Sequence, residues 1–252
     1  STRNYFQGSK RHTRQLMDRC RDIEKKYPLP PDSWHKCHQY YVAPKVMQKM
    51  KNAWTFGIGK DARHEGWLRY FNPDVIVQSF DPTHISKSTI HHENWTVMHR
   101  DRDLGFSPGE KAKLQWFNYA YHPSGKRVEF FTHDPGRKCY STINIESKKL
   151  IDQVTVRTKN VKGLLETQVH PDYIKFDVEG LWWEFVKDLL DNNLHVSQLV
   201  GEFEMYFGDE NLQFERLNII IQLMQEAGYV VFTNRILRTN MVELAFVKKG
   251  LV

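Results

Sequence analysis

Two pairs of carboxylates stand where apolar runs of the sequence stop, and these acids are the residues best suited to chemistry. Asp177 ends the run "YIKF", and Glu179 follows two positions later, just before Gly180. Glu202 and Glu204 end a second run, "QLVGEFE". Residues two apart on a strand share a face, so Asp177 and the second pair can face one cleft from neighbouring strands, unless that pair lies on a sheet edge. There a carboxylate can accept a proton or hold a metal ion.

Helix capping is an alternative interpretation of the first pair. The stretch "LWWEFVKDLL" predicts a helix directly after Gly180. An acid before a helix can accept hydrogen bonds from its free amides, which stabilises the helix by about 0.5–2 kcal/mol. Capping accounts for Asp177 or Glu179 but not for both. The other acid is therefore left for function.

A second constellation could hold a nucleoside. Gly57 and Gly59 follow a predicted strand in "FGIG", where glycine lets a ligand approach the backbone. Asp81 ends the next predicted strand in "FDPT" and could accept both hydroxyls of a ribose. Position 62 is alanine, so the G-x-G-x-x-G fingerprint is incomplete. This favours S-adenosylmethionine over NAD, since the former has no pyrophosphate to bind. The further candidates for this site are Phe56 and Leu104.

The histidines show no HExxH motif or other clear metal-ligand spacing. His133, followed by Asp134, is the best candidate for a histidine–carboxylate base. No G-x-S-x-G elbow and no Walker loop is present.

Charge is unevenly distributed along the 252 residues. Residues 1–60 hold 13 Lys/Arg against 4 Asp/Glu, a balance of +9, although the whole chain carries only +6. Such a basic segment could bind nucleic acid, anionic lipid or an acidic partner, or form a solvated helix face. There is no RGG run and no repeated aromatic spacing, so no strong nucleic-acid signature is present.

Few features of the sequence bear on the compartment. No apolar stretch approaches the roughly 20 residues of a membrane span, and no signal peptide is recognised. The sequon Asn94-Trp95-Thr96 would matter only in the secretory pathway, so a Golgi-type lumen and the cytoplasm both stay open. Three cysteines without a CxxC motif suggest reduced thiols, with a Cys20–Cys37 bridge as the alternative.

Strand and helix patterns alternate from residue 53 onward and close on two adjacent strands, "YVVFTNR" and "MVELAFVKK". Alternation predicts a mostly parallel sheet covered on both faces, and the short final connection predicts an antiparallel hairpin. This pattern is typical of class I methyltransferases. We expect a basic helical extension over 1–52, a methyltransferase domain over 53–252, and an insertion or lid over about 105–150. Residues 1–9 are kept apart because "YFQGS" resembles a protease-site scar, although it could equally be native.

Several of these blocks together resemble one family. "DYIKFDVEGLWWEF" is similar to the "lKiDvEGaE" signature of FkbM-type methyltransferases, and "WTFGIG" and "VQSFDPT" to motifs of their animal methyltransferase-like branch. The resemblance spans about residues 53–248. It implies a class I fold, S-adenosylmethionine as methyl donor, and methylation of a hydroxyl, often on a sugar or glycan.

The resemblance also implies roles for single residues. Gly57, Gly59 and Asp81 match the donor site. Asp177, Glu179 and Glu202 match acidic positions near the transfer site. Glu204 stands where relatives commonly have histidine; if that histidine is the family's base, this chain has replaced it with a carboxylate or lost activity.

The expected mechanism is in-line methyl transfer with Asp177 or Glu204 as base, or with Asp177 and Glu204 holding a divalent metal. Two other functions stay open. They are a nucleic-acid or protein methyltransferase that uses the basic segment, and an inactive scaffold on the same fold.

Overall fold

The structure is a computed structural model that describes residues 10–83, 85–93, 114–133, 140–144 and 148–252. Among the residues named above, Leu104, Asp134, Cys139 and the sequon at 94–96 lie outside this part of the chain, as do residues 1–9. No helix in the described part is long and apolar enough to cross a membrane.

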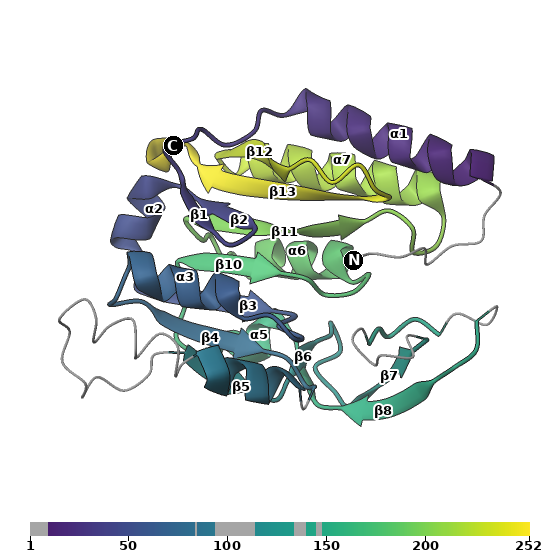
Figure 1. The fold of residues 1–252 in the computed structure, drawn as a ribbon, viewed down its shortest axis with the longest axis horizontal. Coiled ribbons are helices and arrows are strands. Elements are labelled where there is room, and N and C mark those ends of the chain that lie inside the picture. Colours follow the sequence, from purple (N-terminus) through teal and green to yellow (C-terminus); the bar gives the residue numbers. More distant parts are fainter. Residues whose placement is uncertain (1–9, 84, 94–113, 134–139, 145–147) are drawn as a thin grey trace.

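A seven-stranded sheet forms the centre of the described structure (Figure 1). In spatial order its strands are β12 (Tyr229–Arg235), β13 (Met241–Lys248), β11 (Gln198–Glu204), β10 (Tyr173–Phe176), β3 (Asn52–Phe56), β4 (Ile76–Phe80) and β5 (Leu114–Phe117). β13 pairs antiparallel with β11 and with β12, and the other neighbours pair in parallel. This arrangement is the class I methyltransferase form of the Rossmann-like sheet. The predicted fold class, including its C-terminal antiparallel hairpin, is confirmed.

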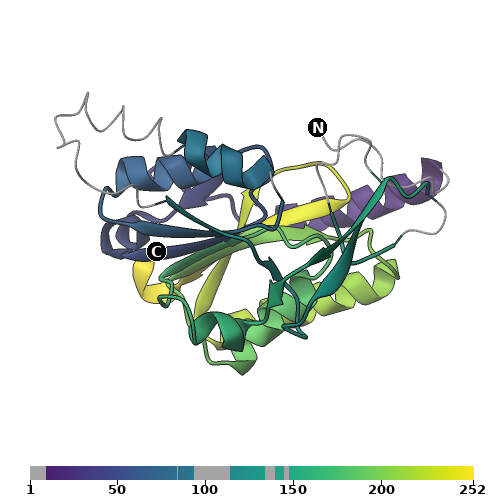
Figure 2. The same cartoon turned by 90° about the horizontal axis from the view of Figure 1, so that it is seen from below.

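Helices cover both faces of this sheet, as a parallel sheet requires. Figure 2 shows the blue α3 (Arg63–Phe71) on one side of the sheet and the green α6 (Trp182–Asp191) and α7 (Glu210–Glu226) on the other. Each face has its own apolar core. Every residue of β10 is buried, which fits a central strand between two cores. Further helical elements are α5 (Val161–Leu165), the 3-10 turn η1 (Lys249–Leu251) and residues 85–93.

The N-terminal segment is not an independent helical extension, because it contributes to both cores. α1 (Lys10–Lys26) packs along β12 and β13 and buries Cys20. α2 (Pro44–Lys49) and an unpredicted hairpin, β1 (His35–Cys37) with β2 (Tyr40–Val42), cover the other face. Cys20 and Cys37 are free thiols in different cores, so the alternative disulfide is wrong.

The predicted insertion over about 105–150 is only partly separate from the sheet. β5 lies inside that range yet pairs with β4 as a strand of the central sheet. The segment after it forms an arm, which we define as residues 118–133, 140–144 and 148–159. The strands of the arm are β6 (Ala120–Tyr121), β7 (Val128–Thr132), β8 (Asp152–Val156) and β9 (Thr158–Lys159). β7 and β8 form a hairpin that extends from the carboxyl end of the parallel strands (Figure 1).

Candidate active site

Parallel pairing places the carboxyl ends of β3, β4, β10 and β11 at one edge of the sheet. Ligands of open α/β sheets bind outside this edge. The predicted glycines follow β3, Asp81 follows β4, Asp177 follows β10, and Glu204 ends β11. Sequence positions more than 100 residues apart therefore meet at one place.

The glycine loop, residues 57–59, needs glycine for two different reasons. Gly57 has φ +72° and Gly59 has φ +54°, a backbone region that favours glycine. A Cβ atom on Gly57 would also lie 2.3 Å from the carbonyl oxygen of Asp177, whereas a Cβ on Gly59 would meet no atom within 4 Å. Gly57 thus lets the loop pack on the end of β10, and Gly59 leaves open space beside the loop.

Asp81 holds the glycine loop through its amides. Its Oδ2 accepts from the N–H groups of Ile58 at 2.8 Å and Gly59 at 2.9 Å. Its Oδ1 accepts from the backbone N–H of Thr83 at 2.8 Å and from the Thr83 hydroxyl at 2.6 Å. A carboxylate has about four acceptor positions, so these bonds saturate Asp81. The predicted ribose contact therefore requires an exchange of bonds at this side chain.

The turn after β10 contains two residues in the left-handed conformation, and neither acid caps the helix that follows. Glu179 has φ +47° and Gly180 has φ +89°. The N-cap of α6 is Leu181, and no side chain caps that helix. The capping interpretation of Asp177 and Glu179 is therefore wrong, because the turn carries the chain four residues past Asp177 before α6 begins. Both acids are left for another role.

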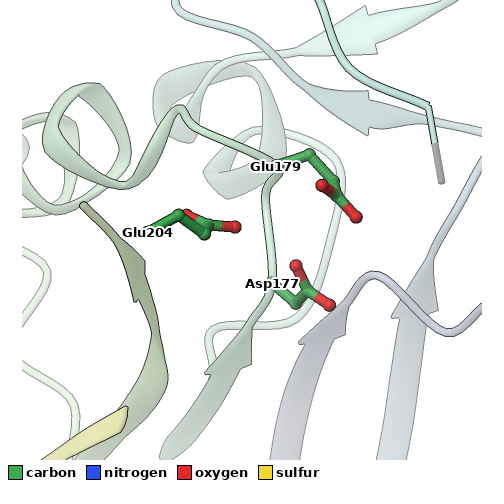
Figure 3. A group of neighbouring side chains, drawn as sticks. All are labelled: Asp177, Glu179 and Glu204. Atoms are coloured by element: carbon green, nitrogen blue, oxygen red, sulfur yellow. The ribbon is translucent and has the colours of Figure 1, made fainter. Parts of the chain in front are cut away.

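Three carboxylates converge at this turn (Figure 3). Asp177, Glu179 and Glu204 each offer an oxygen atom, and these atoms all lie within 4.8 Å of one another. Glu204 is buried, and the N–H of Gly180 approaches its Oε2 at 3.4 Å. We call these three residues the acidic cluster.

Glu202 shares the face of Glu204 but has its own partners. The hydroxyl of Tyr40 donates to its Oε1 at 3.4 Å, and the Arg235 guanidinium lies 3.9 Å away. Arg235 also forms an ion pair with the fully buried Glu243, a β13 residue that lies opposite Glu202 in the β11–β13 pairing. The shared face predicted for Glu202 and Asp177 fits the register, since Phe176 pairs with the residue before Glu202.

Burial and crowding change the acidity of these carboxyls. Burial raises the pKa of Asp177 to about 7, with Glu202 adding to the shift and Lys175 opposing it. Burial and Glu243 likewise raise the pKa of Glu202 to about 7. Burial, then Asp177, raise the pKa of Glu204 well above its usual range. A carboxyl that titrates near neutrality can exchange a proton with a substrate under physiological conditions.

A cavity of about 160 Å³ lies between the glycine loop and the arm. Its polar boundary comes from the glycine loop, Asp81 and the turn after β10. Its apolar boundary is aromatic, and the rings of Phe56 and Phe80 stack with centroids 4.9 Å apart. The arm supplies Tyr121, Phe130 and Tyr140. The predicted residues that line this cavity are Phe56, Gly57, Gly59, Asp81, Asp177 and Glu179.

The other predicted residues are not among the described residues that line this cavity. Glu204 reaches the site through the acidic cluster, and Glu202 lies beside Asp177 on the neighbouring strand. His133 follows β7 in the arm, with its Nδ1 3.1 Å from the Lys149 carbonyl oxygen, and is not among the described residues that line the cavity. Leu104 and the Asp134 half of the predicted dyad lie outside the described residues.

Trp182 and Trp183, which follow the turn, are not among the described residues that line the cavity. Trp182 is fully buried in the core, and its indole N–H donates to the Glu204 carbonyl at 3.1 Å. The Arg216 guanidinium of α7 lies 5.3 Å from the Trp183 ring centre. Trp182 therefore ties the turn after β10 to the end of β11.

Sequence reasoning missed Lys175 and the aromatic residues of the arm. Lys175 is a single charge inside an apolar strand, and that interruption was the available signal. The residues Phe130 and Tyr140 reach the cavity only through the folding of the arm, for which the sequence offers no spacing rule.

No protein-family model matches the chain, and no curated protein matches it. Solved structures resemble it weakly. An O-methyltransferase family protein from Burkholderia thailandensis aligns with TM-score 0.41 and 10% identity over 81% of this chain and 52% of that chain, so this chain spans about half its length. Precorrin-6y C5,15-methyltransferase from Geobacter metallireducens gives 0.43 and 11%, over 90% and 96%. An O-methyltransferase from Bacillus cereus in complex with SAH gives 0.44 and 10%, over 93% and 91%. Likenesses this weak transfer no residue role.

Proposed function

We propose that this chain is an S-adenosylmethionine-dependent O-methyltransferase that acts on a hydroxyl of a sugar or glycan. One observation carries the proposal. The glycine loop and Asp81 line the same cavity as Asp177 and Glu179, so a nucleoside-type site and a carboxylate of raised pKa share one space. The FkbM-type resemblance of the "FGIG", "FDPT" and "DVEG" blocks supports the donor and the acceptor class.

The residues at the cavity suit this donor. Gly59 leaves open space for a ligand, and the stacked Phe56 and Phe80 offer an aromatic wall for an adenine ring. Carboxylates at Asp177 and Glu179 suit a cationic sulfonium. When bound, the donor supplies an electrophilic methyl group. Asp81 would contact the ribose by giving up its bonds to Thr83 while its Oδ2 keeps the loop amides.

Asp177 is the preferred base. Its pKa of about 7 makes it ionised in a large share of molecules at neutral pH, and its burial limits competition from water. The Asp177 carboxylate would accept the hydroxyl proton of an acceptor whose oxygen takes the methyl group that a bound donor would supply. Glu204 is the less suitable base, since its Oε2 faces the Gly180 amide and its pKa lies well above its usual range.

The arm supplies the acceptor side. Phe130 and Tyr140 line the cavity opposite the glycine loop, and aromatic faces stack well on sugar rings. The Tyr140 hydroxyl donates to Asp152 at 3.0 Å, and the Ser141 hydroxyl donates to the Glu179 carbonyl at 3.3 Å. The first bond lies within the arm, and the second holds the arm against the turn after β10, where an acceptor hydroxyl would lie.

A metal-assisted variant is favoured by the acidic cluster. Its three oxygen donors lie close enough to share one cation, and hard oxygen ligands suit Mg²⁺ or Mn²⁺. Asp177, Glu179 and Glu204 would hold the ion, which would lower the pKa of an acceptor hydroxyl. Transfer that persists unchanged after chelation and metal removal would rule this variant out.

The test of the proposed function begins with binding. Calorimetry and thermal shift with S-adenosylmethionine and S-adenosylhomocysteine should show binding, whereas NAD should not bind. A panel of glycan acceptors, read by mass for a gained methyl group, then tests transfer. Absence of donor binding would contradict the proposal and leave a scaffold role on this fold. Donor binding with transfer to RNA or protein, but to no glycan, would replace the acceptor class.

A further inference from the structure

Lys175 is a buried cation in the middle of the sheet. It lies in β10 between β3 and β11, and only 5% of it is exposed. Its neighbours in the strand, Ile174 and Phe176, are fully buried. An ammonium group that leaves water loses several kcal/mol of hydration unless other groups replace it. A lysine at this position therefore has a specific set of partners.

Those partners belong to the glycine loop and to the end of β3. The Lys175 Nζ donates to the carbonyl oxygen of Phe56 at 2.9 Å and to that of Gly57 at 2.8 Å. The Phe56 carbonyl also accepts from the Asp177 N–H at 3.2 Å. The ammonium lies 5.6 Å from the centre of the Tyr40 ring, which covers it from the hairpin β1–β2.

Lys175 and Asp81 hold opposite groups of the same short segment. The cation binds carbonyl oxygens at Phe56 and Gly57, while the Asp81 carboxylate binds the N–H groups of Ile58 and Gly59. Hydrogen bonds with one charged member are shorter and stronger than neutral ones. A cation in β10 thus binds the carbonyl groups of this segment, and a carboxylate directly after β4 binds its N–H groups.

The same ammonium also faces the carboxylates of the site. Its positive charge opposes the upward pKa shifts of Asp177 and of Glu202. Lys175 is therefore in electrostatic contact with the acids while it is hydrogen-bonded to the glycine loop. Asp81, which binds the loop amides, adds to the upward pKa shift of Asp177, so the two charged residues that hold the loop act on this carboxyl in opposite directions.

We infer that Lys175 is a positioning residue that preorganises the glycine loop for the methyl donor, through its bonds to the Phe56 and Gly57 carbonyls. The inference rests on the proposed function for the identity of the donor. Without this cation, the Gly57 carbonyl would lose its ammonium partner and the Phe56 carbonyl would keep only the Asp177 N–H, so the loop would sample other conformations before a donor binds. Donor affinity would fall because part of the binding free energy would be used to order the loop.

Two substitutions and one matched control test this inference. Lys175→Met keeps most of the length of the side chain and removes its charge and donors, and Lys175→Gln keeps an amide donor. Tyr173→Phe is the control, because Tyr173 lies on the same strand and face, is fully buried, and its hydroxyl contacts only His64 Nε2 at 3.1 Å among the described bonds. If Lys175 had a purely structural role, its substitution would lower the stability of the fold, as Tyr173→Phe does, and would leave donor affinity unchanged.

Calorimetry with S-adenosylhomocysteine should show binding weakened at least about tenfold in Lys175→Met and less in Lys175→Gln. Tyr173→Phe should bind as the original protein does. Equal affinity in all folded variants would overturn the inference. If Lys175→Met does not fold, the affinity of Lys175→Gln is compared with that of the original protein and of Tyr173→Phe.

Amide hydrogen exchange separates this inference from the proposed function, since it needs no donor. Exchange at Ile58 and Gly59 should accelerate at least about tenfold in Lys175→Met and not in Tyr173→Phe. If the original protein bound no donor at all, the proposed function would fail, and faster exchange would still support loop positioning. Unchanged exchange at both amides would overturn it.

Discussion

Gly57 and Asp177 approach so closely that a Cβ atom on Gly57 would lie 2.3 Å from the Asp177 carbonyl oxygen. The glycine loop and the residue after the carboxyl end of β10 therefore approach each other through their backbones. If the proposed donor binds at the glycine loop, this close approach would link its binding to the position of Asp177.

The two glycines of the loop should differ in their tolerance of alanine. Gly59→Ala should cost about 1 kcal/mol of unfolding free energy, since its φ is +54° but the space beside it is open. Gly57→Ala should cost about 1–3 kcal/mol more, because the added Cβ meets backbone. Urea denaturation measures both. Equal losses would contradict the close contact with Asp177.

Asp81 should control the glycine loop more than Thr83 does. In Asp81→Asn one carboxylate oxygen becomes an NH₂ donor, which must face either the loop amides or Thr83, so donors oppose donors. Amide exchange at Ile58 and Gly59 should accelerate about 10- to 100-fold. Thr83→Val removes only the 2.6 Å hydroxyl bond and should leave these amides protected. Similar exchange in the two variants would show that Asp81 does not restrain the loop.

The crowded carboxyls predict stability that falls as pH rises. The pKa of Asp177 is raised from 3.8 to about 7 and that of Glu202 from 4.5 to about 7, so the folded state binds these protons more tightly than the unfolded state. Their contribution is full below pH about 4 and is lost as pH rises through about 7.

Asp177→Asn and Glu202→Gln should therefore raise the thermal midpoint at pH 8 by roughly 2–4 °C for each kcal/mol of relieved strain. The gain should disappear below pH 4. Thermal unfolding across pH 4–8 measures it, and a gain independent of pH would show that the acids are not crowded as described.

Trp182 and Trp183 should differ in their effect on stability. Trp182→Phe removes the indole partner of the Glu204 carbonyl and leaves space in the core, so it should cost about 2–3 kcal/mol. Trp183→Phe should cost less than about 1 kcal/mol, because that ring is only partly buried beneath Arg216. Urea denaturation measures both losses, and the reverse order would show that the Trp182 bond to the Glu204 carbonyl contributes little to stability.

Much of the sheet could be predicted because its signals are local. The apolar run "YIKF" and the glycines after "WTF" mark where β10 and β3 end, and strand alternation then fixes the edge at which Asp177 and Glu204 meet. Residues at the carboxyl ends of parallel strands can therefore be predicted from the sequence.

The remaining features depend on contacts that no spacing rule describes. The β1–β2 hairpin has strands of only 3 residues each, too short for a periodic signal. A cap was expected at Asp177 or Glu179 because the left-handed conformation of Glu179, a non-glycine residue, is not visible in the sequence. The role of Lys175 cannot be predicted from the sequence, because its acceptors are backbone carbonyls, which every residue type carries.

The position of β13 has a consequence for the chain while it is being made. β13 is the last strand and lies between β11 and β12, with Glu243 opposite Glu202. A nascent chain that already contains β11 still lacks this partner, so one side of β11 is an open strand edge that could pair with other chains. In an unfolded segment Glu202 and Glu204 are ionised at neutral pH. The two acids would then act as gatekeepers that discourage aggregation until the final strand arrives.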